Sequence, residues 1–268
     1  MSVRAWGRLR RAMLAAVVAG STWGTAVATE AQVHELPTRP GVTQRLLLLT
    51  PPEPKAVVVL LPGGHGGLQL GLDGAMRWGE GNFLVRSRER FAAQGLAVAV
   101  LDAPSDRQGP PFLAGFRQTP EHVADVAATL AWLRQRHRLP VWLVGTSRGT
   151  QSAAHVATVL PPPEGPDGLV LTATILSDTR GRPVPAMALE RVTVPVLVVH
   201  HEQDGCGHCA FAEVPALMAK FTHAPRRELL SFTGGRNVGE PCEAFAHHGF
   251  NGLEAEVVRR VTDWVLAR

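Results

Sequence analysis

The stretch 140–151, P-V-W-L-V-G-T-S-R-G-T-Q, constrains the fold more than any other part of the chain. Residues 140–144 form a short apolar run that begins at a proline and ends before a glycine, which predicts a buried parallel strand. Residues 150–160 carry apolar side chains at the spacing of a helix packed on a sheet. Between them, the pattern G-x-S-x-G around Ser147 predicts a sharp, strained turn that holds the serine hydroxyl clear of the sheet.

The predicted position of Ser147 favours chemistry in which negative charge develops. The amide N–H groups of the first helical turn and the helix dipole both stabilise an anion at that place. Gly145 and Gly149 leave room for the neighbouring elements to pass close to the turn. Because a strand precedes the motif and a helix follows it, we interpret Ser147 as a nucleophile and not as a chance match in a glycine-rich chain.

The first 28 residues have the features of a secretory signal peptide. Four arginines precede an apolar run over 12–20, and A-V-A at 26–28 matches the small-x-small pattern of a cleavage site. The apolar run is short and interrupted for a membrane span, although an uncleaved N-terminal anchor stays open as the alternative. We therefore predict an exported protein, periplasmic or secreted, with no stable membrane insertion after cleavage.

The basic balance of the chain belongs largely to this N-terminal segment. The chain has 27 Lys and Arg against 23 Asp and Glu, a formal net charge of +4. Removal of residues 1–28 takes away four arginines and no acidic residue, which brings the formal net charge to 0. The charge therefore predicts neither a nucleic acid nor an anionic surface as a partner.

Residues 29–268 are predicted to form one α/β domain, because their length is ample for a single core. Predicted strands alternate with predicted helices, which indicates a mostly parallel sheet covered by helices on both faces. The first two apolar runs, at 44–49 and 56–61, are separated by a proline-rich turn and are predicted to form an antiparallel pair. Further strands are expected at 97–101, 169–176, 195–200 and 228–232, and further helices at 83–94, 120–133 and 254–266.

Three motifs together resemble the α/β-hydrolase superfamily, and the resemblance covers nearly all of residues 29–268. The elbow serine comes first, an acid follows the next-but-one strand in V-L-V-V-H-H-E-Q-D, and a histidine precedes the last helix in A-H-H-G-F. The resemblance implies the α/β-hydrolase fold and a catalytic triad of Ser147, Asp204 and His248. In kind it is similar to exported serine esterases without a lid, of the dienelactone-hydrolase type.

Alternatives remain for the acid and for the histidine. Asp178 follows the strand before that of Asp204, and some relatives place the acid there, whereas Glu202 is a weaker neighbour. His247 stands beside His248, and only one of the two can face the nucleophile. We favour His248 because the glycine that follows it lets the loop approach the serine, and the phenylalanine after that can anchor the turn.

The sequence P-G-G-H-G-G at 62–67 has the composition of an oxyanion hole. Such a site needs two N–H groups about 3 Å from the oxygen that becomes an anion. The resemblance assigns these donors to the backbone N–H groups of Gly64 and Arg148. A plain glycine-rich turn is the alternative. The loop is no phosphate-binding motif, because no lysine followed by serine or threonine comes after it.

The three cysteines allow more than one arrangement. Cys206 and Cys209 form a C-x-x-C motif with the spacing of thiol–disulfide oxidoreductases, but the surrounding chain lacks the small size and element order of thioredoxin. In an exported protein, a disulfide between Cys206 and Cys242 would tie the acid loop to the histidine loop, and this is the pairing that we favour. Cys209 is then the odd thiol or an alternative partner. A zinc site lacks a recognisable ligand spacing; its candidate ligands would be His200, His201, His208 and these thiols.

The predicted activity is that of a serine hydrolase that cleaves carboxylic esters or related acyl compounds through an acyl-enzyme. The chemistry requires no cofactor and no metal, and the expected partner is a small-molecule acyl or ester substrate. Acyl transfer and peptide hydrolysis use the same triad and stay open, as does the oligomeric state. The segment before the strand at 195–200 is too short for a lid domain, so an open site is expected. The loop 103–118 would border it, with Phe112, Leu113 and Phe116 as substrate contacts or as ordinary packing.

Overall fold

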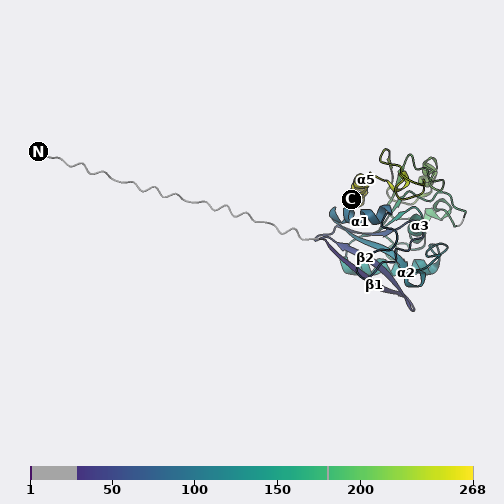
Figure 1. The fold of residues 1–268 in the computed structure, drawn as a ribbon. Helices are drawn as coiled ribbons and strands as arrows, with labels where there is room; N and C mark the ends of the chain where they lie inside the picture. The colour runs from purple at the N-terminus through teal and green to yellow at the C-terminus, as the bar shows by residue number, and fades with distance from the viewer. Residues whose placement is uncertain (2–28, 180, 268) are drawn as a thin grey trace.

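A computed structural model describes Met1 and residues 29–179 and 181–267 (Figure 1). The strands form one eight-stranded sheet with the order β1-β2-β4-β3-β5-β6-β7-β8. The predicted signal peptide falls on residues that lie outside the described part, apart from Met1. In the part of the chain that the structure describes, none of the helices has the length and apolar character needed to cross a bilayer.

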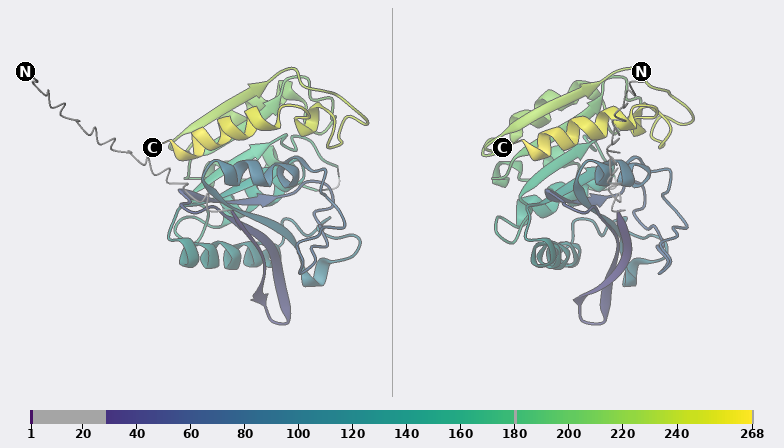
Figure 2. Two further views of the ribbon diagram at one scale, coloured as in Figure 1. Left: turned by 60° about the vertical axis from the view of Figure 1, so that its left-hand side comes forward. Right: turned by 90° about the vertical axis from the view of Figure 1, so that its left-hand side faces the viewer.

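The sheet is parallel except at its first edge. β3 to β8 all run parallel to one another, whereas β2 is antiparallel to both β1 and β4. The β1–β2 hairpin extends beyond the rest of the sheet (Figure 2). The strands are β1 (Glu30–Arg39), β2 (Val42–Thr50), β3 (Ala56–Leu61), β4 (Leu96–Pro104), β5 (Val141–Thr146), β6 (Gly168–Thr172), β7 (Val196–His201) and β8 (Arg227–Phe232).

The predicted antiparallel pair of 44–49 with 56–61 is wrong. β2 pairs instead with β1, a strand that the sequence analysis did not predict, and β3 lies between β4 and β5. The physical reason is burial: all six residues of β3 are buried and apolar, which suits a central parallel strand covered on both faces. β1 is mostly polar and half exposed, so it shows no apolar run.

Helices cover both faces of the sheet, as predicted. α1 and α5 pack on one face, and α2, α3 and α4 pack on the other (Figure 2). The helices are α1 (Phe83–Ala93), α2 (Pro120–His137), α3 (Gly149–Val159), α4 (Val214–Lys220) and α5 (Glu254–Leu266). Short 3₁₀ turns are η1 (Ser105–Arg107), η2 (Val184–Ala186), η3 (Leu189–Arg191), η4 (Phe211–Glu213) and η5 (His247–Gly249).

β3 shows how the two cores are divided. Val57 and Val59 point into the core with α2 and α3, whereas Val58 and Leu60 point into the core with α1 and α5. Successive side chains of a strand point to opposite faces, so an apolar strand of this kind feeds both cores at once. This double burial fixes the sheet rigidly beneath the loops at its carboxyl edge.

The strand predicted at 169–176 ends earlier, at Thr172. Ala173 has a φ of 45°, in the left-handed region, which takes the backbone out of the sheet. The N–H of Thr174 then donates to Nε2 of the buried His200 at 2.7 Å instead of continuing the ladder. Residues 173–176 therefore do not extend the strand, and Ile175 among them lines the cavity beside Ser147.

Candidate active site

Ser147 stands in the sharp turn between β5 and α3. Its φ is 50°, a left-handed value that is rare for a residue with a side chain and marks a strained backbone. Its N–H donates to the carbonyl of Thr172 at 3.0 Å, and its own carbonyl accepts from the N–H of Thr150 at 2.9 Å. A Cβ on Gly145 would lie 2.6 Å from the carbonyl oxygen of Gly149, so this close crossing requires glycine. The strain is thus held by bonds on both sides of the serine.

Asp204 and His248 come together from two different loops. Asp204 follows β7 and His248 lies in η5, and Oδ2 of the carboxylate is 2.9 Å from Nδ1 of the imidazole. The exposed fractions of the two side chains are 0% and 5%. The second carboxylate oxygen accepts from the N–H of Cys206 at 2.9 Å. A carboxylate in this position holds the Nδ1–H tautomer of the histidine and leaves Nε2 free to act as a base.

Nε2 of His248 is buried and has no hydrogen-bond partner among the described residues. His248 and Ser147 line the same cavity, whose volume is about 590 Å³. The glycine-rich loop 62–67 lines this cavity too, together with the exposed side chains of Val238 and Phe245. An imidazole nitrogen without a protein partner, on a residue that lines the same cavity as a serine, is available to accept a proton.

His247 is turned toward different neighbours. Its ring stacks on that of His201, with the ring centroids 4.2 Å apart and the planes 10° from parallel. Its Nδ1 is 3.2 Å from the carbonyl oxygen of Gln203. The side chains of the two adjacent histidines therefore diverge, and it is His248 that meets the carboxylate of Asp204.

The two alternative acids make other contacts. Oδ2 of Asp178 accepts from Nη1 of Arg148 at 2.7 Å and from Nε2 of Gln151 at 2.9 Å, which ties the segment after β6 to the start of α3. Glu202 accepts from the hydroxyl of Ser231 at 2.7 Å. The structure brings Asp204, and neither of these, to the imidazole of His248.

The glycine loop lies directly against Ser147. A Cβ on Gly63 would be 2.9 Å from Cβ of Ser147, whereas a Cβ on Gly64 would meet no atom within 4 Å. Gly64 has a φ of 59°, which favours glycine. Arg148 is the N-cap residue of α3, where backbone N–H groups have no acceptor within the helix. Both residues line the cavity beside Ser147.

Arg117 is a residue that the sequence analysis missed. Its guanidinium is buried and donates to the carbonyls of Pro62 and Gly64 at 3.0 and 3.2 Å, and to the hydroxyl of Ser152 on α3 at 3.0 Å. Burial, and then the nearby charge of Arg148, lower the pKa of Arg117 to about 9. Within the described residues it takes part in no ion pair. A single cation thus holds the carbonyls on either side of the peptide that joins Gly63 and Gly64.

The apolar side chains of the loop 103–118 mainly pack against other residues and do not line the cavity beside Ser147. Leu113 and Phe116 are buried against Ala103, and the Phe112 ring stacks on His65 with the centroids 4.3 Å apart. None of the three residues lines the cavity beside Ser147, and Leu113 lines a neighbouring cavity of about 420 Å³ that Gly64 also lines. The ordinary-packing alternative therefore describes Phe112 and Phe116.

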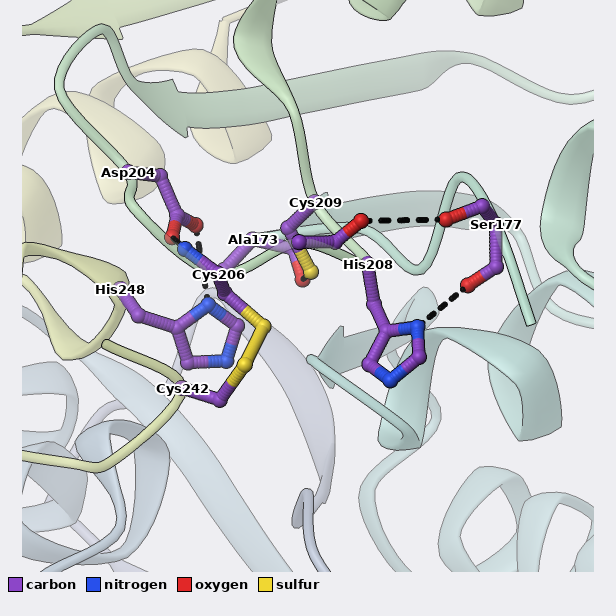
Figure 3. Close-up of a disulfide and its surroundings, with 9 residues drawn as sticks. Ala173, Ser177, Asp204, Cys206, His208, Cys209, Cys242 and His248 are labelled. Atoms are coloured by element: carbon purple, nitrogen blue, oxygen red, sulfur yellow. Dashed lines mark hydrogen bonds and ion pairs between the residues drawn. A yellow bond between two sulfur atoms is a disulfide. The ribbon is translucent and has the colours of Figure 1, made fainter. Parts of the chain in front are cut away.

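A disulfide joins Cys206 to Cys242, with the two Cα atoms 4.5 Å apart (Figure 3). It links the loop of Asp204 to the loop of His248, and both cysteines line the cavity. Cys209 is free and buried. The favoured pairing is thus the one that the structure contains.

The histidines of the zinc alternative are held apart by backbone contacts. His200 binds the N–H of Thr174, and its burial lowers its pKa to about 4. His201 lies between the N–H of Gln203 and the carbonyl of Gly234. Among the described residues, the group with metal-ligand spacing is Cys206, Cys209 and His248. The sulfur of Cys206 is in the disulfide, so this group offers no set of free thiolates.

No protein-family model matches the chain, and no curated protein matches it in sequence. Solved structures do share its fold. A dienelactone hydrolase from Anabaena variabilis superposes with a TM-score of 0.62 at 15% identity, over 89% of this chain and 97% of that one. An esterase of Pyrococcus furiosus superposes with a TM-score of 0.63 at 14% identity, over 88% of this chain and 92% of that one. A lidless α/β serine hydrolase from Xanthomonas campestris superposes with a TM-score of 0.54 at 16% identity, over 89% of this chain and 98% of that one.

These superpositions show that the chain has the α/β-hydrolase fold, as its motifs predicted. The similarity spans nearly the whole of each chain, 89% of this chain and 97–98% of the other in two of these comparisons. Identities of 14–16% establish the fold and leave the activity to be argued from the site.

Proposed function

We propose that the protein is a serine hydrolase that cleaves carboxylic esters or related acyl compounds through a triad of Ser147, Asp204 and His248. The observation that carries the proposal is the meeting of three chain segments at one cavity: a strained serine at a helix N-terminus, a buried imidazole, and a carboxylate 2.9 Å behind that imidazole. Each segment supplies the group that a different step of acyl transfer needs.

The mechanism follows from these positions. Nε2 of His248 takes the proton of Ser147 as Oγ attacks the carbonyl carbon, and Asp204 stabilises the imidazolium that forms. The backbone N–H groups of Arg148 and Gly64 donate to the oxygen as it becomes an anion. The imidazolium then gives its proton to the leaving alcohol. Water repeats the cycle on the acyl-enzyme and releases the acid.

Two observations favour hydrolysis of esters over the other reactions of this triad. Between β6 and β7 the described residues form only the short turns η2 and η3, so no helical lid excludes water. Solved structures of the same fold include a dienelactone hydrolase and esterases. Acyl transfer and amide hydrolysis would differ in acceptor or leaving group, not in the triad.

A substrate series tests the proposal. We expect hydrolysis of p-nitrophenyl esters of graded acyl length, with little cleavage of the matching anilides and little transfer to added alcohols. Ser147→Ala should lose about 10⁶-fold in kcat and keep its circular-dichroism spectrum, because the nucleophile is gone and the fold is not. Substantial ester hydrolysis by folded Ser147→Ala would refute the mechanism.

We further propose that residues 1–28 direct export and are removed. The disulfide between Cys206 and Cys242 supports this, because such bonds persist in oxidising compartments outside the cytosol. N-terminal sequencing of the protein from a cell fraction outside the cytosol should find a start at Thr29. An intact N-terminus in the membrane fraction would favour the uncleaved anchor.

A further inference from the structure

The C-x-x-C motif has a feature that the hydrolase site leaves unused. Cys206 is bonded to Cys242, but its motif partner Cys209 carries a free thiol whose residue is 0% exposed. The two motif cysteines form a tight turn, in which the N–H of Cys209 donates to the carbonyl of Cys206 at 2.8 Å. A reduced cysteine is therefore held beside an intact disulfide.

The sulfur atoms are close together. Sγ of Cys206, Sγ of Cys209 and a ring nitrogen of His248 all lie within 4.8 Å of one another. In Figure 3 the sulfur of Cys209 lies beyond that of Cys206, on the side away from Cys242. Thiol–disulfide exchange proceeds by attack of one sulfur on a neighbouring sulfur, with the far sulfur as the leaving group. Cys209 is on the side from which such an attack would displace Cys242.

We propose that Cys206, Cys209 and Cys242 form a second reactive site, in which Cys209 exchanges with the disulfide and releases Cys242. The sulfur of Cys209 loses its proton and attacks Sγ of Cys206. A Cys206–Cys209 bond forms as the Cys206–Cys242 bond breaks, and Cys242 leaves as a thiolate that takes up a proton. One disulfide replaces another, so the step needs no external oxidant or reductant.

The backbone already suits the product. Residues at the two ends of a hydrogen-bonded four-residue turn have Cα atoms less than about 7 Å apart, which overlaps the range that a disulfide spans. Burial raises the pKa of the Cys209 thiol, so the thiol is protonated in the resting protein. The exchange is therefore slow at neutral pH and accelerates as the pH rises, because the thiolate is the attacking species.

The exchange would act on the hydrolase site, and this consequence rests on the proposed function. The N–H of Cys206 donates to Asp204, and Cys242 lies on an exposed segment six residues before His248. In the exchanged form the covalent link between the acid loop and the histidine loop is lost. The same three sulfurs thus set whether the two loops are tied together, and so how strongly the loop that carries His248 is stabilised.

Packing alone is the competing explanation of Cys209. The residue belongs to a small buried cluster with Ile175 and Cys206, and its thiol donates to the carbonyl of Ala173 at 3.4 Å. Those contacts account for a small apolar side chain. A residue that only packs would keep its thiol reduced at every pH at which the protein is folded, which separates the two explanations.

Tryptic mapping of the full-length, folded protein without reductant tests the proposal. Trypsin leaves Cys206 and Cys209 on one peptide, 192–220, and Cys242 on another, 237–259. After incubation at pH 7, 8 and 9, acid quenching and labelling of free thiols with a maleimide under denaturing conditions, the resting form gives the two peptides cross-linked with the label on Cys209. The exchanged form gives an internally bridged 192–220 and a labelled Cys242.

We expect labelled Cys242 to appear at a rate that rises about tenfold for each pH unit, following the thiolate fraction of Cys209. Cys209→Ser should abolish the label on Cys242 and leave the ester hydrolysis of fresh protein unchanged. Cys242→Ser, treated with oxidised glutathione, should form the Cys206–Cys209 bond.

Label on Cys209 alone at every pH, with Cys242 always cross-linked in folded protein, would overturn the proposal. So would label on Cys242 that persists in Cys209→Ser. The readout is a peptide mass and does not depend on ester hydrolysis, so a protein without esterase activity would leave this test intact.

Discussion

The two sides of the cavity are held by different means. On the side of the proposed nucleophile, Ser147 lies directly between a buried strand and a helix, and the guanidinium of Arg117 binds the glycine loop beside it. On the side of the proposed acid and base, His248 lies within residues 233–253, a long connection with only a 3₁₀ turn, and the disulfide ties this connection to the loop of Asp204.

This difference shows that the covalent link lies where the backbone gives least support. A long irregular connection has many conformations and must be restrained if a side chain on it is to keep a 2.9 Å contact. Ser147, the proposed nucleophile, needs no such link because the sheet and the helix already fix its backbone. Substitutions on each side of the cavity should therefore have different effects on catalysis and on stability.

Replacing His248 by alanine should have the largest effect on kcat of these substitutions. His248→Ala should lower kcat for an activated ester by at least about 10⁴-fold, because the general base and the partner of Asp204 are both lost. His247→Ala should change kcat only modestly, since its ring stacks on His201 away from that carboxylate. Steady-state kinetics on the two purified variants measures this directly. A reversed result would assign the base to His247.

Removal of the disulfide should act on stability before it acts on catalysis. The double variant Cys206→Ser, Cys242→Ser opens a link across 36 residues and should lose about 2–5 kcal/mol in free energy of unfolding. Urea titration followed by circular dichroism measures the loss. Ester hydrolysis at low temperature should persist, because the buried contact between Asp204 and His248 remains. Unchanged stability would show that the histidine loop is restrained without the bond.

On the side of Ser147, Arg117→Met should lower kcat by about 10–100-fold with little change in KM. The reason is that the loss of this arginine frees the loop 62–67, which we propose forms the oxyanion hole, and removes a nearby positive charge. Arg134→Met is the matched control: this arginine also donates to a loop carbonyl, that of Gly165, but far from the site. We expect it to lower stability and leave kcat unchanged. Arg117→Lys keeps the charge and should recover part of the rate. An unchanged kcat in folded Arg117→Met would show that Arg117 does not contribute to catalysis.

Asp178→Asn should have the smallest effect, below about tenfold in kcat, a loss of less than about 1.4 kcal/mol in transition-state stabilisation. Its carboxylate binds Arg148 and Gln151 at the start of α3, and the amide oxygen of asparagine can still accept from one of them. Measuring kcat for Asp178→Asn and for Asp204→Asn under the same conditions compares the two candidate acids. A loss for Asp178→Asn as large as that for His248→Ala would make Asp178 the acid of the triad.

Much of the site could be predicted because its residues lie in short motifs with local meaning. The turn around Ser147 needs glycines at fixed offsets, and the acid and histidine loops follow apolar runs that are easily recognised as strands. The disulfide could be predicted once those two loops were expected to meet. The α/β fold class followed from the alternation of apolar runs and amphipathic segments.

The remaining features depend on tertiary contacts that leave no local pattern. β1 is polar because nine of its ten residues are exposed or half-buried, so no apolar alternation reveals it. The pairing of β2 with β4 joins strands far apart in the sequence, so no local pattern predicts it. Arg117 looks like any loop arginine in the sequence. Only the folded chain shows that it is buried behind the glycine loop without an ion pair in the described region.

Covalent labelling with a fluorophosphonate probe tests the central claim most directly. We expect one phosphonate per molecule, found by mass spectrometry on the tryptic peptide 139–148 at Ser147. Labelling should be absent in Ser147→Ala and slowed by at least about 10³-fold in His248→Ala, because the probe reports the activated serine and its base. A folded protein that stays unlabelled, or that carries the label at another residue, would contradict the assignment of this site.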